Sequence, residues 1–232
     1  KYIDNYSLKN VGTVVVNSDD LKNYLINKRK ITANKINVVN HFSPFVKSDY
    51  EPNFELNNIF YAGNTGRPQN LSAFLRYFQK YFPSEWKLDI YGAGQEFNNL
   101  SEFSNDNIRI NNYLERQELE NVTKDIPFAL ICLDYEITFE GFPGKTFDYL
   151  NMNKVLINFS NPNSVVSKLI DKYGLGFNID LNNPESLKGK LENMKSSNEI
   201  SKILENIKYF QQSVSNKEIA FKSYLELISP SS

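Results

Sequence analysis

The feature that most constrains the fold is a regular alternation of short apolar runs with helical segments between residues 58 and 182. The runs are NIFYAG, KLDIYG, NIRI, FALICL, KVLINF and GFNI, in that order. Helical segments separate most of them, and the one that begins at Asn70 carries Leu71, Phe74 and Phe78 on one stripe. Parallel strands need such crossover connections and are buried on both faces. The pattern therefore predicts an α/β fold with a doubly wound, mainly parallel sheet.

Shorter segments flank this region on both sides. Residues 12–16, 18–30 and 35–40 predict a strand, a helix and a strand, which form one β-α-β unit. Residues 41–57, here called the linker, contain two prolines, mixed charge and no periodicity. From Asn183 onward the chain predicts two or three polar amphipathic helices. The expected parts are a fragment of an amino-terminal domain at 1–45, a hinge at 46–57, the sheet domain at 58–182 and carboxy-terminal helices at 183–232.

The charge balance and the distribution of apolar residues exclude several classes of function. The 26 basic and 27 acidic residues give a net charge of −1, with no long run of one sign, so we expect no nucleic-acid partner. No stretch of about 18 apolar residues occurs, and the first ten residues are polar. We therefore expect a cytoplasmic protein. The single cysteine, Cys132, lies inside FALICL and predicts a buried, inert thiol.

The loop that follows FALICL predicts a phosphate-binding turn. It contains the run EGFPGKT, residues 140–146, and the next helix is expected to begin near Gly144, after Pro143. In open α/β sheets ligands bind beyond the carboxyl ends of the strands. Gly141 and Gly144 allow the backbone to approach a ligand closely. The free N–H groups of Lys145, Thr146 and Phe147 would attract a diphosphate.

Charged side chains in the same stretch suggest how a nucleotide would be held. Lys145 adds a mobile positive charge, and Asp148 lies one turn further along on the same helix face. The two oxygens of the Asp148 carboxylate suit the vicinal hydroxyls of a ribose. Glu140, before the turn, would face a sugar or the reacting centre.

Two other nucleotide motifs fit the sequence poorly. A Walker loop needs a glycine where Phe139 stands, and KVLINF does not end in a magnesium-binding aspartate. In GAGQEF, residues 92–97, Phe97 replaces the third glycine of the dinucleotide fingerprint. GAGQEF therefore predicts a plain strand-to-helix turn.

The stretch EGFPGKTFDYLNMNKVLI resembles the signature of retaining glycosyltransferases of the GT-B fold. In that family two acidic residues eight positions apart flank a glycine-containing turn, and Glu140 and Asp148 have this spacing. NIFYAGNTGR, LDIYGAGQEF and the region from IRINNYLE to FALICLDYE resemble the preceding strands and loops of the nucleotide-sugar (donor) domain. The resemblance covers about residues 55–180 and implies the Rossmann-like donor half of a GT-B enzyme. The GKTFDYL variant is similar to bacterial sugar transferases that build polysaccharides or modify glycoproteins.

The resemblance also implies roles for individual residues. Glu140 would contact the donor sugar as the catalytic candidate, and Asp148 would hold the ribose. Backbone groups along the sugar and diphosphate would come from Gly141, Phe142, Pro143 and Gly144. Contacts to the phosphates would come from Thr65 and Arg67, with Lys145 and Thr146 at the helix start. Asn112, Tyr113 and Leu114 would border the base.

The sequence departs from the family pattern in two places. Family members commonly carry a lysine a few residues after the arginine, but residues 68–70 are Pro, Gln and Asn. Phosphate neutralisation would then fall to Arg67 and Lys145. Asp148 replaces the usual second glutamate, and its shorter side chain requires a closer backbone approach. His41, the only histidine, is expected to be a structural residue of the hinge, and no metal site is expected.

The resemblance implies an enzyme that moves a sugar from a nucleotide-sugar, with UDP as the expected nucleotide, to a glycan, lipid-linked or protein acceptor. No cofactor or metal is expected, and the chain would be a carboxy-terminal piece that carries only the end of the acceptor domain. It would work in the cytoplasm, including the inner face of the membrane, and a homo-oligomer is compatible with its aromatic-rich terminal helices. The alternative is a non-catalytic, glycosyltransferase-like protein that stabilises a partner.

Overall fold

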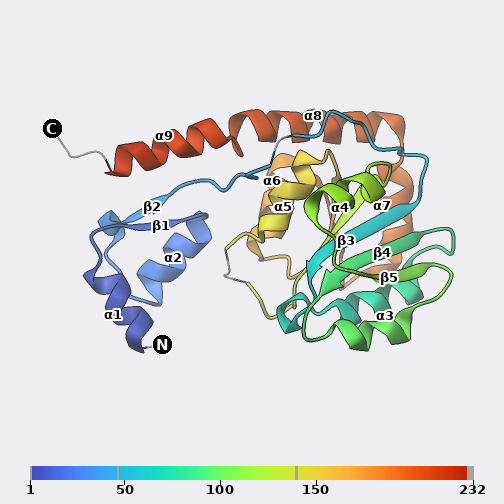
Figure 1. Cartoon of the computed structure of the whole chain (residues 1–232), viewed down its shortest axis with the longest axis horizontal. Helices are drawn as coiled ribbons and strands as arrows, with labels where there is room; N and C mark the ends of the chain where they lie inside the picture. The colour runs from blue at the N-terminus through green and yellow to red at the C-terminus, as the bar shows by residue number, and fades with distance from the viewer. Residues whose placement is uncertain (1, 46, 139–140, 229–232) are drawn as a thin grey trace.

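The computed structural model describes residues 2–45, 47–138 and 141–228, which form two parallel sheets joined by the linker. Figure 1 shows the smaller sheet and the larger sheet side by side, with the last two helices of the chain, α8 (Ser197–Ser213) and α9 (Lys217–Ile228), running along them. No helix in these described ranges is long and apolar enough to cross a membrane.

The smaller sheet is the β-α-β unit that the sequence predicted. β1 (Val14–Val16) pairs in parallel with β2 (Ile36–Val38), and α2 (Asp19–Asn27) connects them through the short 3₁₀ helix η1 (Ala33–Lys35). The hydroxyl of Ser18 caps α2 by accepting a hydrogen bond from the N–H of Leu21 at 3.1 Å. A further helix, α1 (Tyr2–Asn10), precedes the unit. The sequence analysis did not predict α1, because its apolar residues do not form a clear stripe.

The larger sheet has six parallel strands in the order β5-β4-β3-β6-β7-β8. The chain builds outward from β3 in one direction, returns to β6 on the other side of β3, and then builds outward in the opposite direction. This is the topology of a doubly wound sheet, so the predicted Rossmann-like fold is confirmed. The strands are β3 (Asn58–Asn64), β4 (Lys87–Ala93), β5 (Ile108–Asn112), β6 (Phe128–Cys132), β7 (Val155–Phe159) and β8 (Gly176–Asn178).

Helices cover both faces of the larger sheet, with α3 on one face and α4 and α5 on the other (Figure 1). The apolar stripe of α3 is buried, and Phe74 has no exposed surface. Each fully buried side chain of this size contributes about 1.5–3 kcal/mol to stability. The connecting helices are η2 (Arg67–Gln69), α3 (Leu71–Tyr81), the 3₁₀ helix η3 (Phe97–Phe103), α4 (Arg116–Thr123), α5 (Gly144–Asn151) and α6 (Val165–Tyr173).

The GAGQEF segment forms the turn between β4 and η3, as expected. Gly94 has a φ of +146°, where a side chain would be strained, and an added Cβ would lie 2.4 Å from Asn64 Oδ1. The glycines therefore serve a tight turn of the backbone, and the connection to β5 is a 3₁₀ helix in place of an α-helix.

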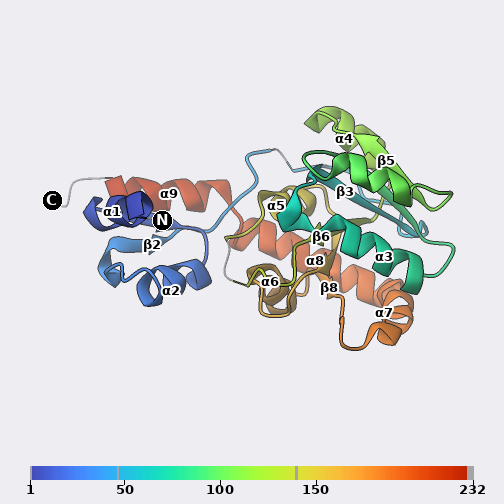
Figure 2. The same ribbon diagram turned by 90° about the horizontal axis from the view of Figure 1, so that it is seen from below.

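The carboxy-terminal region folds into η4 (Pro184–Ser186), α7 (Leu187–Met194), α8 (Ser197–Ser213) and α9 (Lys217–Ile228). Helix α8 packs on α5, α6 and α7. Helix α9 continues away from the larger sheet and lies along the smaller one (Figure 1, Figure 2). Tyr224 of α9 lines a cavity with Val15 and Val16 of β1. The proposed domain boundaries stay a prediction.

Candidate functional site

A crevice opens between β3 and β6, the two central strands at which the strand order of the sheet changes direction. β3 pairs with β4 along seven residues, from Asn58 to Asn64, but with β6 only at Ile59 and Phe60. Beyond Phe60, where β6 no longer pairs with β3, the hydroxyl of Tyr149 from α5 forms hydrogen bonds with the backbone of β3. It accepts from the N–H of Ala62 at 2.7 Å and donates to the Ala62 carbonyl at 3.0 Å. Backbone groups at the diverging strand end are thereby satisfied, as burial requires.

A cavity of about 230 Å³ lies beside this crevice, on the side of α4 and α5. It is bounded by the carboxyl ends of β3 and β4, the segment after β5, and the first turns of α4 and α5. This is the position at which open α/β sheets bind ligands. The lining residues are Phe45, Ala62, Gly63, Tyr91, Tyr113, Leu114, Arg116, Leu119, Lys145, Asp148 and Tyr149.

Lys145 presents a buried and unpartnered ammonium group in this cavity. Its Nζ atom is buried and has no hydrogen-bond partner among the residues that the structure describes. The nearest favourable contact is the ring of Tyr61, whose centroid lies 3.7 Å from Nζ. Burial lowers the pKa of Lys145 from 10.5 to about 7, and the smaller effect of Cys132 opposes this shift. An unpaired buried charge is costly, so this side chain favours an anionic ligand.

The start of α5 adds a second attraction for anions. The residue before the helix, Pro143, cannot cap it with a side chain, and the structure shows no side-chain cap. The N–H of Thr146 donates to the Pro143 carbonyl at 3.0 Å. It is therefore not free to bind a diphosphate, although the sequence analysis expected the first N–H groups of this helix to do so. The helix dipole still places partial positive charge beside Lys145.

Asp148, one turn further along α5, lines the same cavity and is bound to the linker. The hydroxyl of Ser43 donates to Asp148 Oδ1 at 2.7 Å. His41 packs edge-on against Phe147 with ring centroids 4.7 Å apart. Burial lowers the pKa of His41, and the nearby Asp148 carboxylate partly opposes this. His41 thus packs against the first turn of α5.

Four of the residues expected to bind the donor therefore meet in one cavity: Tyr113, Leu114, Lys145 and Asp148. Asn112 is the last residue of β5 and pairs with Gly92 in β4, next to this cavity. Gly144 begins α5, and an added Cβ there would lie 3.7 Å from His41 Nε2.

Other expected residues lie outside the cavity. Thr65 is almost fully buried, and its N–H donates to the Ala93 carbonyl at 2.9 Å. Arg67 is 87% exposed, with its Nε 3.7 Å from Glu96 Oε1. Thr146 has no exposed surface. The structure thus leaves Lys145 without the second cation that the sequence suggested.

The glycine turn before α5 faces the smaller sheet. Gly141 lines a cavity with Asn17, and an added Cβ at Gly141 would lie 2.8 Å from Asn17 Oδ1. Phe142 lines a neighbouring cavity with residues of α6. An ion pair between Lys168 Nζ and Asp20 Oδ1, at 2.6 Å, joins α6 to α2 beside it. Glu140, the catalytic candidate, lies outside the described residues.

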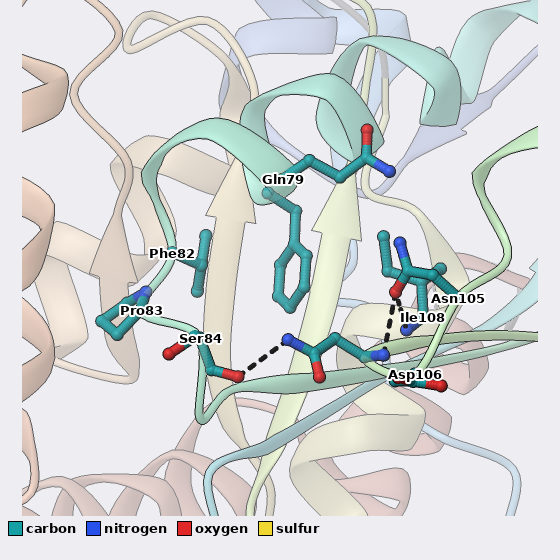
Figure 3. A pocket seen from close by; sticks show the side chains of 9 residues that line it. Gln79, Phe82, Pro83, Ser84, Asn105, Asp106 and Ile108 are labelled. Carbon is teal, nitrogen blue, oxygen red and sulfur yellow. Dashed lines mark hydrogen bonds between the residues drawn. The ribbon is translucent and has the colours of Figure 1, made fainter.

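A larger cavity of about 410 Å³ opens at the opposite edge of the sheet, where α3 ends and β5 begins (Figure 3). Its only charged lining residue is Asp106, and the side chain of Asn107 donates to the Ser84 carbonyl at 2.7 Å. It therefore offers no cation to a phosphate. In the described ranges no three His, Cys, Asp or Glu side chains form a group that could hold a metal ion.

Sequence reasoning missed four residues that shape the candidate site: Tyr61, Tyr149, Phe45 and Arg116. Tyr61 and Tyr149 lie within apolar patterns and could not be told from ordinary core residues. Phe45 belongs to the linker, whose sequence lacks periodicity. Arg116 follows the expected base-contacting residues by two positions, which is the one signal that could have indicated it.

The solved structures that resemble this chain are glycosyltransferases of the GT-B fold. TarM from S. aureus, solved with fondaparinux, α-GlcNAc-glycerol and UDP, has a TM-score of 0.75 at 13% identity over 98% of this chain. HepE from Anabaena, solved with UDP and glucose, has a TM-score of 0.73 at 10% identity over 98% of this chain. The galactosyltransferase WaaB has a TM-score of 0.63 at 18% identity over 93% of this chain.

This chain spans only part of these proteins: 46% of TarM, 67% of HepE and 63% of WaaB. No protein-family model matches the sequence, and no curated protein matches it. The retaining class and the roles of the two acidic residues stay predictions. The chain has the Rossmann-like α/β fold of the GT-B glycosyltransferases, as the sequence resemblance implied.

Proposed function

We propose that this chain is the donor-binding part of a sugar transferase whose donor is a nucleoside diphosphate sugar, with UDP as the nucleotide. The observation that carries the proposal is the ammonium group of Lys145, which is buried at the strand ends and has no hydrogen-bond partner within the described part of the chain. A diphosphate would supply the missing counter-charge and hydrogen bonds. The structures of TarM and HepE with UDP support this choice of nucleotide.

The cavity offers matching chemistry for each part of the donor. Lys145 and the start of α5 attract the diphosphate, and Asp148 accepts hydrogen bonds from the ribose. Tyr113 and Leu114 border the base. Glu140 is expected to contact the sugar, as its place before the glycine turn suggests.

In the proposed reaction an acceptor hydroxyl forms a bond to the anomeric carbon of the sugar, while the bond from that carbon to the diphosphate breaks. The hydroxyl proton passes to a base, and the bonding electrons leave with the nucleoside diphosphate. Negative charge then grows on the diphosphate oxygens, where Lys145 and the α5 dipole stabilise it. The acceptor is a glycan, a lipid-linked sugar or a protein.

A thermal-shift titration with UDP, GDP, ADP and NAD, each with and without magnesium, tests the proposal. A nucleotide at a hundredfold excess over its Kd stabilises by about 2.7 kcal/mol, which raises the Tm of a chain this size by roughly 5–10 °C. We expect this shift with UDP and its loss in Lys145→Met. The matched control is Lys208→Met, which changes an exposed lysine of α8 and should keep the shift.

A second candidate function is a non-catalytic partner that keeps this fold. The observation in its favour is the outward position of Arg67, which removes from the cavity one of the two cations expected to bind the phosphates. One structural neighbour is the GtfA/B complex, with a TM-score of 0.71 at 15% identity. The absence of any nucleotide shift, together with a stable complex with another protein, would favour this function.

A further inference from the structure

The linker lies along α5 and reaches the cavity that holds Lys145. Asn151 Nδ2 donates to the Phe45 carbonyl at 3.0 Å, and the N–H of Ser48 donates to the Asn151 carbonyl at 2.9 Å. Ser43 binds Asp148, as described above. These contacts join residues more than 100 positions apart in the sequence, so they fix the linker against the helix that carries the anion-binding lysine.

Phe45 is the linker residue that forms part of the cavity wall. Its side chain is 43% exposed, and the guanidinium carbon of Arg116 lies 4.5 Å from the centre of its ring. Arg116 is itself held by Glu120, with a hydrogen bond of 2.7 Å from Nε to Oε1. Arg116, held in place by Glu120, therefore covers part of the Phe45 ring, and the rest of the ring is open to solvent.

A second exposed aromatic ring lines the same cavity. Tyr113, in the segment after β5, is 54% exposed. Single exposed aromatic residues are common on protein surfaces, but two that line one cavity offer flat apolar surface to a ligand. A nucleobase has such a face, and stacking on an aromatic side chain is favourable for every base.

The two basic side chains of the cavity differ in their partners. Among the residues that the structure describes, Lys145 has no acidic partner, whereas Arg116 forms an ion pair with Glu120 and packs against Phe45. Of these two side chains, Lys145 is the better placed to attract phosphate, because Glu120 balances the charge of Arg116 next to Phe45.

We infer that the nucleobase of the donor packs against Phe45, so that the linker supplies one wall of the donor site. The inference rests on the proposed function and adds to it a residue from the linker. It also connects the nucleotide to the hinge. The same linker holds Asp148 Oδ1 through Ser43, so a ribose bound at Asp148 shares this carboxylate with the linker.

Isothermal titration calorimetry with UDP, uridine and inorganic pyrophosphate tests the inference. The variants are Phe45→Ala, Phe45→Tyr and the matched control Phe221→Ala, which removes an exposed ring on α9. We expect Phe45→Ala to weaken UDP and uridine binding about tenfold, from the loss of one stacked ring. Pyrophosphate binding should stay within about twofold, because that ligand has no base. Phe45→Tyr, which keeps the ring, and Phe221→Ala should bind all three ligands like the wild type.

Unchanged UDP binding by Phe45→Ala would refute the inference and leave the proposed function standing. Equal weakening of UDP and pyrophosphate would also refute it, because Phe45 would then act through the shape of the whole cavity. If the wild type bound neither UDP nor pyrophosphate, the proposed function and the inference would both be overturned. The Tm of each variant verifies folding, and we expect little change because the Phe45 ring is partly exposed.

Discussion

Replacing Lys145 by methionine should stabilise the empty protein while removing its affinity for nucleoside diphosphates. Methionine keeps the length of the side chain and removes a buried charge that has no hydrogen-bond partner in the described ranges. The lowering of the Lys145 pKa from 10.5 to about 7 corresponds to at most about 5 kcal/mol of unfavourable free energy for the charged form. Relaxation and water entry reduce this, so we expect a gain of about 1–3 kcal/mol at pH 7.

The gain should shrink as the pH rises. The pKa of Lys145 is lower in the folded protein than in the unfolded chain, so between pH 7 and about 10 the unfolded chain binds more protons. The stability of the wild type therefore rises with pH in this window, and the methionine variant lacks this contribution. We expect the two proteins to differ most at pH 7 and below, less at pH 9, and least above about pH 10.

Urea denaturation at pH 7 and pH 9 measures both effects. For an m value of about 2 kcal/mol/M, a gain of about 2 kcal/mol would raise the midpoint by roughly 1 M. Lys154→Met is the matched control: burial lowers the pKa of this lysine to about 7 as well, but its ammonium donates to the carbonyls of Thr123, Lys124 and Ile126 at 2.7, 2.8 and 2.9 Å. It should lose about 1–3 kcal/mol. A Lys145→Met protein less stable than the wild type at pH 7 would refute the reasoning.

Two further predictions concern ligand binding and the strand end. Because a diphosphate needs Lys145 charged and burial lowers its pKa to about 7, UDP affinity should fall up to about tenfold per pH unit from pH 7 to 9. Calorimetry in buffers of different ionisation enthalpy should detect proton uptake, and an affinity independent of pH would contradict this. Tyr149→Phe removes both hydroxyl bonds to Ala62 and should cost about 1–3 kcal/mol in urea denaturation. A loss below about 0.5 kcal/mol would show that water replaces the hydroxyl.

Most elements of the fold could be predicted because their signals are local. The spacing of apolar residues distinguished the strands of the larger sheet from the helices between them, and Ser18 marked the start of α2. The connection through η3 and the amino-terminal α1 were missed. Neither segment has a long apolar stripe, and their positions depend on packing against other elements.

The candidate site could be predicted only where its residues lie close together in sequence. Lys145 and Asp148 share one face of α5 by helical spacing, and Tyr113 and Leu114 follow directly after β5. Arg67 was expected beside the phosphates, but its loop directs it towards Glu96 and solvent. Loop conformation depends on turns and distant contacts, which apolar periodicity does not encode.

The sequence by itself determined the alternation of strands and helices, the glycine turn before α5 and the presence of a cation on its first turn. Tertiary structure decided what surrounds that cation. The divergence of β3 from β6 opened the crevice, Tyr61 came beneath Lys145, and the linker brought Phe45 to the same cavity. The pKa of Lys145 and the aromatic wall arise from contacts between residues far apart along the chain. Such contacts depend on strand order and burial, which exist only in the folded protein.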